Sequence, residues 1–383
     1  MGPEHRFQIT VPPEIVPVCL NELASIGMAG TQAGQAGLEL SGRLKEAYIC
    51  NLWLRTAGRV LCSLPRFRAG AAEELFYKVS RIPWDLWLSP EIPLDIEARV
   101  EYSRINHEGR VAEIVSGSIE KSLKKERFPN PPAGFEREEP ARLKQKVYVG
   151  LVENHCLISL DMTGAHLHQR GYRPAHTGAP LRETLAAAIL LKSAWNGREP
   201  LVDGMCGSGT FPIEAALISR RIAPGLGRDF LFQKWPSFQK ETMEYLVRRA
   251  REDSIPNAPE SIIGIDLDPE AVDVAAQNAG RAGVGRDIKW ERMNFFDFNP
   301  GKAGLKQGLI VLNPPYGVRL DSGGVGLYDK IGAHLRLNFK GWKYAVLARS
   351  RMEAAALGTG RARLWNIRHG GMNVTVVLGR ISS

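Results

Sequence analysis

Long apolar runs and organised cysteines are both scarce in this chain. No stretch approaches the roughly 18 apolar residues of a membrane-spanning helix, and residues 1–12 lack the apolar segment of a secretory leader. The five cysteines are scattered, without a Cys-x-x-Cys pair or histidines at metal-binding spacing. This pattern indicates neither a disulfide framework nor a metal site. We therefore expect a cytoplasmic protein with no metal and no membrane partner.

Acidic residues are also in deficit. The 383 residues include 50 Lys and Arg but 41 Asp and Glu, which gives a net charge of +9. A positive surplus suits a polyanionic partner through phosphate neutralisation, although many basic proteins bind no nucleic acid. Hydrophobic residues make up 44% of the chain, enough for the cores of two or three domains.

A proline-rich motif follows the apolar run 309–312. Asn313-Pro314-Pro315-Tyr316 keeps the backbone extended, because proline fixes φ and lacks an N–H group. The Asn313 side-chain oxygen and the Pro314 carbonyl can each accept one hydrogen of an exocyclic nucleobase amine, while Tyr316 stacks on the ring. The amine then presents its lone pair to an electrophile. The alternative interpretation is a strand that ends in an ordinary proline-rich turn.

A glycine-rich turn forms the second motif. The apolar segment Leu201-Val202-Asp203 leads into Gly204-Met205-Cys206-Gly207-Ser208-Gly209, and we expect a helix over 211–222. Glycines permit positive φ and a close backbone approach, so an adenosine-type cofactor can lie against the helix N-terminus. A dinucleotide fingerprint would have a third glycine where Pro212 stands.

A second buried strand, 261–266, ends in an acid. The Asp266 carboxylate is suited to accept both hydroxyls of a ribose. Helix capping is the alternative, and it suits Asp268, which precedes Pro269 at a first helical position, better than it suits Asp266.

Periodicity predicts a split βαβ, or ferredoxin-like, first region. Its expected elements are a strand 6–11, a helix 13–26, a short strand 28–33, a strand 36–41, a helix 43–56 and a strand 58–66. The next region is expected to contain a helix 71–81, a strand 93–103, a helix 110–126, a mobile loop 128–134 and a hairpin of 146–152 with 155–161. From about 165 onward, alternating strands and helices predict a parallel sheet, which an antiparallel hairpin over 362–381 completes.

Together, these motifs resemble the guanine-N2 RNA methyltransferase family that carries an N-terminal THUMP domain. The resemblance covers nearly the whole chain and rests on segments 203–210, 222–225, 264–269 and 313–317, with accessory segments 51–57, 82–84, 168–173 and 179–186. It implies an α/β fold: a C-terminal Rossmann-like class I methyltransferase domain, with a mostly parallel sheet and an antiparallel last strand, preceded by a ferredoxin-like and THUMP α+β region. The implied domains are 1–66, 67–162 and 163–383.

The resemblance also implies a reaction. An enzyme of this family transfers a methyl group from S-adenosylmethionine to the N2 amine of a guanosine in RNA, with large-subunit ribosomal RNA expected before transfer RNA. We expect it to act as a monomer. A DNA or protein amino-methyltransferase would share the Asn-Pro-Pro-Tyr motif but has no use for the first 160 residues. A non-catalytic RNA-binding factor is a third reading, which the intact Asn313, Asp203 and Asp266 oppose.

The resemblance assigns expected roles to individual residues. Asn313, Pro314 and Tyr316 are the catalytic candidates, and Pro315 completes the base-binding motif. The cofactor candidates are Asp203, Gly204, Cys206, Gly207 and Gly209 near the methionine portion, Asp266 on the ribose, and Asn294 or Asp297 on the adenine edge with Phe295 packed on the ring. The residues Pro180, Glu183 and Thr184 are expected to close the carboxylate end, although a plain helix N-terminus also explains them.

Basic residues around the second predicted region are the candidates for RNA capture. Lys121, Lys124, Lys125 and Arg127 crowd the end of one predicted helix. The alternative for each is an ordinary solvated charged face. The segment 168–173 lies at the predicted junction, where Arg170 and Arg173 are expected either to steer the RNA strand or to belong to an interdomain hinge.

Overall fold

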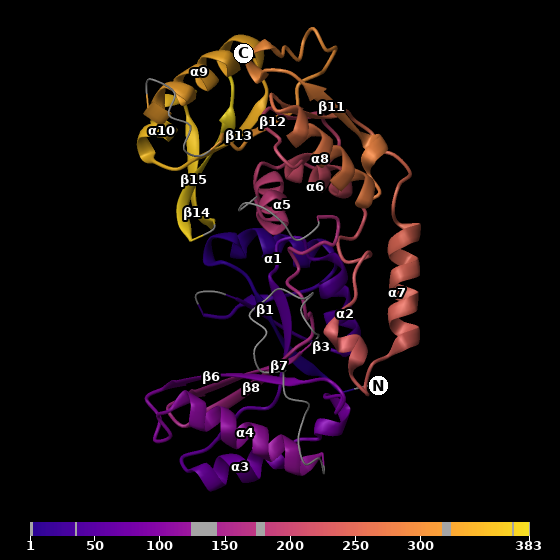
Figure 1. The fold of residues 1–383 in the computed structure, drawn as a ribbon, viewed down its shortest axis with the longest axis vertical. Helices are drawn as coiled ribbons and strands as arrows, with labels where there is room; N and C mark the ends of the chain where they lie inside the picture. The colour runs from indigo at the N-terminus through magenta and orange to yellow at the C-terminus, as the bar shows by residue number, and fades with distance from the viewer. Residues whose placement is uncertain are drawn as a thin grey trace.

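Two β-sheets organise the molecule along its long axis (Figure 1). The computed structural model describes residues 3–34, 37–123, 144–173, 181–315, 323–369 and 371–382. We call the sheet built from β1 to β8 the N-terminal sheet and the sheet built from β9 to β15 the C-terminal sheet. In the described residues, no helix is both long and apolar enough to cross a membrane.

The first part of the N-terminal sheet has the predicted ferredoxin-like layout. β1 (His5–Thr10) lies antiparallel between β3 (Leu38–Gly42) and β4 (Arg59–Ser63). The predicted short strand is present as the two-residue β2 (Thr31–Gln32) beside β3. The connecting helices are α1 (Val16–Ser25) and α2 (Leu44–Trp53), close to the predicted 13–26 and 43–56.

The second region continues the same sheet instead of forming a separate one. Its elements are β5 (Phe67–Arg68), α3 (Ala72–Ser80), β6 (Leu94–Glu101), α4 (Glu108–Ser122), β7 (Gln145–Val152) and β8 (His155–Asp161). The predicted hairpin is confirmed as the antiparallel pair β7 and β8, with β6 parallel to β7. Because β8 pairs with β4, all strands share one sheet, in the order β2-β3-β1-β4-β8-β7-β6 with β5 beside β8. The expected loop 128–134 lies outside the described residues.

The C-terminal sheet confirms the predicted mixed architecture. Its seven strands follow the order β11-β10-β9-β12-β13-β15-β14. They are β9 (Leu201–Asp203), β10 (Ile262–Asp266), β11 (Ile288–Arg292), β12 (Leu309–Leu312), β13 (Lys343–Ala348), β14 (Ala362–His369) and β15 (Met372–Arg380). The first five are parallel, and the closing hairpin adds β15 antiparallel to β13 and β14 antiparallel to β15.

The central strands β9, β10, β12 and β13 of the C-terminal sheet are buried on both faces, as expected for parallel strands. Alternate residues of one strand point to opposite faces: Leu201 belongs to one hydrophobic core and Val202 to the other. The first core continues without interruption into the N-terminal sheet, where it includes Phe7 and Leu160. The covering helices are α5 (Glu183–Lys192), α6 (Thr210–Ser219), α8 (Pro269–Arg281), α9 (Gly323–Asn338) and α10 (Arg351–Ala356).

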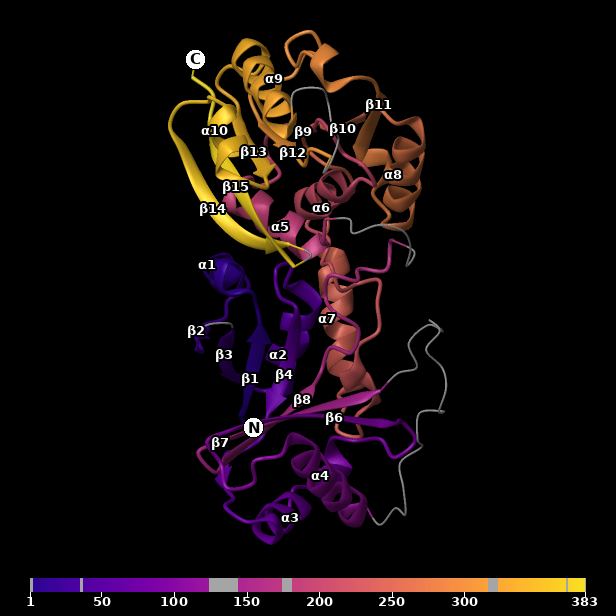
Figure 2. The same cartoon turned by 60° about the vertical axis from the view of Figure 1, so that its left-hand side comes forward.

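The segment between α6 and β10 reaches back to the N-terminal sheet, which the sequence patterns did not predict. It contains α7 (Lys240–Glu252), which runs beside α2 along one side of the molecule (Figures 1 and 2). Tyr48 of α2 stacks on Phe232 with a centroid distance of 4.3 Å, and its hydroxyl accepts a hydrogen bond from the Gln239 N–H. The α7 residues Met243, Leu246 and Ala250 are buried with helical spacing, the signal by which the helix could have been found.

Candidate active site

The strand order makes the carboxyl end of β9 the expected position of a ligand site. The chain proceeds from β9 to β10 and β11 on one side, and then crosses to β12 on the other side of β9. This reversal of direction is a topological switch point, where open α/β sheets bind their ligands. The strand ends bring Asp203, Asp266 and Asn313 to one edge, because β9, β10 and β12 are parallel neighbours.

The glycine-rich turn connects β9 to α6 at this edge. Gly207 has φ of +51° and Gly209 has φ of +84°, the left-handed conformation that the sequence predicted for this turn. A Cβ on Gly204 would lie 2.4 Å from Cδ2 of Phe295 and 2.7 Å from Cδ2 of Leu312. Gly204 therefore permits close packing between the start of the turn, β12 and Phe295. The predicted helix 211–222 is present as α6, but it ends at Ser219.

Asp203 is the most deeply buried of the predicted acids, with 1% of its surface exposed. One carboxylate oxygen accepts a hydrogen bond from the Met205 N–H at 3.2 Å. Burial raises the pKa of Asp203 well above its ordinary value, the Met205 N–H opposes this shift, and the negative charge of Asp266 reinforces it. Burial likewise raises the pKa of the neighbouring Cys206 thiol, so that thiol stays protonated.

Asp266 organises the turn from the end of β10. Its Oδ2 atom accepts a hydrogen bond from the Gly207 N–H at 2.8 Å, and its Oδ1 atom accepts one from the Asp268 N–H at 3.0 Å. Each carboxylate oxygen can accept a further hydrogen bond, so these contacts leave capacity for ribose hydroxyls. As expected, Asp268 is the N-cap of α8, with its side chain accepting from the Glu270 N–H at 2.9 Å.

The proline motif begins directly after β12. Asn313 is half-buried, Pro314 is buried and Pro315 is exposed, while Tyr316 lies outside the described residues. The Gly204 N–H donates to the carbonyl of Val311 at 3.2 Å, which fixes the glycine turn beside the base of the motif. The structure thus brings the two sequence motifs together on adjacent strands.

The three candidates for the adenine edge differ in environment. Asn294 is exposed, and its side chain accepts a hydrogen bond from the Phe296 N–H at 3.1 Å. Asp297 is exposed in the same short turn. Phe295 is 3% exposed and packs edge-on against His334 at a centroid distance of 4.8 Å. Phe295 therefore belongs to the core behind Gly204, whereas Asn294 and Asp297 both stay available to a ligand.

A charged pair connects the starts of α5 and α6. Arg173 donates to the Thr210 hydroxyl at 2.6 Å and forms an ion pair with Glu183 at 3.6 Å. Glu183 is buried at the first position of α5, Thr184 is half-buried beside it, and Pro180 lies outside the described residues. Arg173 thus links the starts of α5 and α6, a role that neither sequence interpretation gave it, and Glu183 stands at the helix N-terminus that the alternative interpretation offered.

Arg170 is buried, which argues against the expected RNA contact. Only 5% of its surface is exposed, and it forms an ion pair at 3.4 Å with Glu214, which is fully buried in α6. Its guanidinium also donates to the carbonyls of Leu167 at 2.7 Å and Arg55 at 2.6 Å. This network joins the junction segment to both halves of the molecule. Arg55 follows α2 of the N-terminal half, and Glu214 belongs to α6, which covers the C-terminal sheet. We correct the expectation accordingly: the side chain is a structural tie between the two halves.

The remaining RNA candidates are on or beyond α4. Lys121 is exposed, with its ammonium 5.3 Å from the ring centroid of Phe76. Lys124, Lys125 and Arg127 lie outside the described residues. Within the described part of the chain, no group of three or more metal-ligating side chains occurs.

Sequence patterns did not identify one residue that supports the glycine turn. Asn278 of α8 is 1% exposed, and its side-chain amide donates to the carbonyl of Ser208 at 3.1 Å. It therefore fixes the glycine turn from the neighbouring helix. A polar residue within the apolar face of a predicted helix was the available signal.

The donor set at this edge of the sheet fits an adenosine-type cofactor. A close-packed glycine turn, a carboxylate with remaining acceptor capacity at the end of the next strand, and an exposed Asn294 meet at one edge. Together with the sheet order, these features define a Rossmann-like methyltransferase domain joined to a ferredoxin-like domain.

Comparison with known families agrees with this class. The model of the RMKL-like methyltransferase domain matches residues 170–376, and the model of the RlmL ferredoxin-like domain matches residues 6–61. The chain belongs to the RMKL-like methyltransferase family.

Relatives of similar sequence carry related names. A Synechocystis protein named as a candidate RNA methyltransferase is 33% identical over 94% of this chain and 92% of its own length. The ribosomal RNA large subunit methyltransferases K/L of Syntrophotalea carbinolica and Methylococcus capsulatus are 34% and 33% identical. The chain spans only 52% and 50% of their lengths.

Solved structures match the whole fold. A candidate methyltransferase crystallised with S-adenosylhomocysteine aligns over 99% of this chain, with a TM-score of 0.83 and 29% identity. A possible methylase of Clostridium difficile gives the same TM-score at 28% identity. A Listeria monocytogenes protein described as a predicted N6-adenine-specific DNA methylase also gives 0.83, at 27% identity.

Proposed function

We propose that this chain transfers a methyl group from S-adenosylmethionine to the exocyclic N2 amine of a guanosine in RNA, with large-subunit ribosomal RNA as the preferred substrate. The observation that carries the proposal is the position of Asn313-Pro314-Pro315 at the carboxyl end of β12, next to the glycine turn that follows β9. In this arrangement the amine that receives the methyl group and the cofactor that donates it are held at the ends of adjacent strands, so the two reactants meet at one edge of the sheet.

The residues of the β9–α6 turn and the neighbouring strand ends are the proposed cofactor site. S-adenosylmethionine supplies an electrophilic methyl group on a sulfonium. Gly204 lets the start of the turn pack closely against Phe295 and Leu312, and Asp266, with acceptor capacity left on its carboxylate, is the proposed ribose ligand. Asn294 and Asp297 are the alternatives for the adenine edge. Arg173 and Glu183 hold the starts of α6 and α5 in place around this site.

The proline motif is proposed to orient the acceptor amine. A guanine amine is a poor nucleophile because its lone pair is delocalised into the ring. Hydrogen bonds from the amine to the Asn313 side-chain oxygen and the Pro314 carbonyl favour a pyramidal nitrogen, and positioning lowers the barrier further. No strong general base is needed, because the methylated amine loses its proton after transfer.

RNA as the substrate class is supported by the names of the relatives and by the charge of the chain. The relatives named above are ribosomal RNA methyltransferases and a candidate RNA methyltransferase. The net charge of +9 favours a polyanion. We propose that the region 67–162 is a THUMP domain that captures folded RNA, that 1–66 and 163–383 are the other two domains, and that exposed Lys121 contributes to capture.

The test is transfer of labelled methyl from S-adenosylmethionine to ribosomal RNA, transfer RNA and DNA purified from cells that lack this gene, followed by nucleoside analysis. The proposal predicts N2-methylguanosine in ribosomal RNA. The same product in transfer RNA alone would change the substrate. N6-methyladenine in DNA would replace the proposed function by the activity for which the Listeria protein is named.

A variant at the motif separates catalysis from binding. Asn313→Ala is expected to lower the transfer rate by about 100-fold or more, because amine positioning is lost, while cofactor and RNA binding persist. The matched control is Asn257→Ala, at an exposed asparagine before β10, which should leave the rate unchanged. Unchanged transfer by Asn313→Ala would refute the proposed role of the motif.

A further inference from the structure

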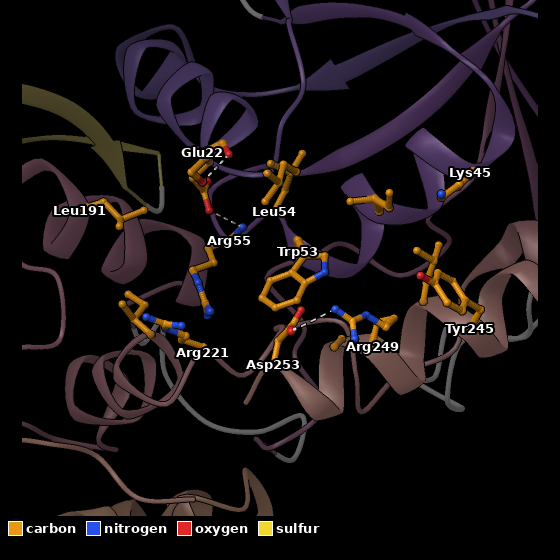
Figure 3. A pocket seen from close by; sticks show the side chains of 16 residues that line it. Glu22, Lys45, Trp53, Leu54, Arg55, Leu191, Arg221, Tyr245, Arg249 and Asp253 are labelled. Atoms are coloured by element: carbon orange, nitrogen blue, oxygen red, sulfur yellow. Dashed lines mark hydrogen bonds and ion pairs between the residues drawn. The ribbon is translucent and has the colours of Figure 1, made fainter. Parts of the chain in front are cut away.

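A cavity of about 710 Å³ lies between α1 and α2 on one side and α5, α6 and α7 on the other (Figure 3). Two helices supply much of its lining. Lys45, Ile49 and Trp53 follow one another at four-residue intervals on α2. Tyr245 and Arg249 of α7 face it with the same spacing. Its volume is within the range of roughly 300–1,000 Å³ typical of small-molecule sites.

A buried arginine leaves one donor group unsatisfied at this cavity. Arg55 is 8% exposed and lines the cavity just after α2. Its Nη2 atom donates to the carbonyls of Ile222 at 2.8 Å and Leu217 at 3.4 Å, but Nη1 has no hydrogen-bond partner in the described residues. An unsatisfied buried donor is costly, and because Nη1 is closed off from solvent it adds positive charge beside the cavity without a direct ligand contact. Burial lowers the pKa of Arg55 to about 10, so the guanidinium still carries its charge at neutral pH.

A second arginine stands where the backbone favours glycine. Arg221 lines the cavity just after α6, with φ of +54°. The Ile222 N–H donates to the Leu217 carbonyl at 2.9 Å across it, which makes Arg221 the left-handed residue of a helix C-terminal motif. Glycine occupies such positions without steric cost, whereas other residues are strained there. The helix dipole favours a cation at this end, and a ligand anion would favour it further.

The charges around the cavity are unequal. Four cations line it, Lys45, Arg55, Arg221 and Arg249, against the two acids Glu22 and Asp253. The Glu22 carboxylate already has hydrogen-bond partners, because it accepts from the backbone N–H groups of Arg55 and Thr56 at 2.9 and 3.0 Å. Asp253 lies 3.8 Å from Arg249. Lys45 and Arg221 have no ion pair within the described residues, and both are exposed at the rim.

Aromatic surface completes the lining. Trp53 is half-buried at the end of α2, and Tyr245 is 45% exposed on α7. Figure 3 shows the Trp53 indole between the Arg55 and Arg249 side chains. Indole and phenol faces stack on planar rings such as nucleobases, and arginine side chains bind phosphate through paired N–H groups.

We propose that this cavity binds a nucleoside phosphate, with the base on Trp53 and the phosphate beside Arg221 and Lys45. The ligand is either a nucleotide of an RNA strand or a free nucleotide, which share this chemistry. The cavity is remote from the candidate active site, because α6 separates Arg221 from the cofactor turn by ten residues, about 15 Å of helix. The inference therefore holds whichever base the enzyme methylates.

The test is calorimetric titration of the full chain with guanosine 5′-monophosphate, with a short single-stranded RNA and with inorganic phosphate. We expect binding of the nucleotide or the RNA, and at least tenfold weaker binding of phosphate alone. Preference for RNA over the mononucleotide identifies an RNA subsite, and the reverse identifies a free-nucleotide site. Phosphate binding as tight as nucleotide binding, or no binding of any of the three, would overturn the proposal and leave the cavity to solvent.

Variants assign the binding to the cavity. Arg221→Gly removes a cation at a backbone position that suits glycine, so the chain should fold, and affinity should decrease about tenfold as one charged contact is lost. Arg286→Gly, at an exposed arginine outside the cavity, is the matched control and should bind normally. Equal affinity of Arg221→Gly and the control would contradict the proposal.

A mapping experiment does not depend on any variant. Photocrosslinking with 4-thiouridine 5′-monophosphate should label peptides that contain Trp53 or Tyr245, and S-adenosylhomocysteine should not compete. Labelling confined to the peptides of the β9–α6 turn, or displaced by S-adenosylhomocysteine, would place the nucleotide at the active site and overturn the inference.

Discussion

The two ends of α6 differ in the type of residue that adopts positive φ. At its N-terminus lies the glycine turn of the proposed cofactor site, where Gly207 and Gly209 adopt positive φ without steric cost. At its C-terminus Arg221 adopts positive φ although glycine would fit better there. The N-terminal end therefore has glycines, which leave the backbone open to the proposed cofactor. The C-terminal end has a charged side chain at a backbone position that glycine would occupy with less strain. This difference is why we assign cofactor binding to one end and a charged ligand to the other.

The middle of α6 connects these ends, and disrupting it should have the largest effect. Glu214→Gln is expected to destabilise the chain by about 3–5 kcal/mol, because it leaves the buried Arg170 without its carboxylate. Urea denaturation followed by circular dichroism measures the loss. The control is Glu252→Gln, which removes an exposed pair with Arg249 and should cost about 0–1 kcal/mol. Similar losses in both variants would show that the buried pair is not a structural tie.

The backbone requirement at the N-terminal end is tested by adding one carbon. Gly204→Ala places a Cβ against Phe295 and Leu312, and overpacking of this kind costs about 1–3 kcal/mol. Cofactor affinity should decrease with it, as measured by titration with S-adenosylhomocysteine. Gly227→Ala adds the same carbon where no atom lies within 4 Å, so it should behave like the parent chain. If Gly204→Ala binds S-adenosylhomocysteine normally, cofactor binding does not depend on close packing at Gly204.

At the C-terminal end, the positive φ of residue 221 predicts that glycine there is more stable than alanine. Arg221→Gly should be more stable than Arg221→Ala by about 1 kcal/mol, because both remove the guanidinium but only glycine relieves the left-handed strain. Thermal unfolding of the two variants side by side provides the comparison. Equal stability would mean that the backbone at this position carries no strain, and the contrast between the two ends of α6 would disappear.

Asp203, just before the glycine turn, should change how the stability of the chain depends on pH. Because the folded chain raises the pKa of Asp203 above its ordinary value of 3.8, the folded state keeps a proton that the unfolded state releases. Stability should therefore decrease as the pH rises from that value, by up to about 1.4 kcal/mol per pH unit, until the raised pKa is passed.

Asp203→Asn tests this linkage, since it removes the titrating group. The stability of the variant relative to the parent chain should increase between pH 5 and pH 8, as measured by urea midpoints, whereas Asp229→Asn at an exposed site should show a constant difference. A constant difference for Asp203→Asn as well would refute the pKa shift.

Local patterns predicted most of the fold. Alternation and helical periodicity located the strands and helices of the N-terminal sheet to within a few residues, because each element has one face in a core. They did not predict that β8 pairs with β4, since strand pairing across the two regions depends on contacts far apart in sequence. They also missed α7, whose charged residues obscured a narrow apolar stripe.

The sequence by itself determined which segments form the candidate active site, because the glycine turn, the strand-end acids and the proline motif are each continuous segments whose backbone constraints are local. Only the tertiary structure decided which distant residues meet. It placed Arg170 in a buried ion pair instead of on an RNA-binding surface, and it brought Arg55, Arg221 and Trp53 to one cavity from separate elements. Burial and long-range pairing arise from the packing of whole sheets and helices, which no short motif encodes.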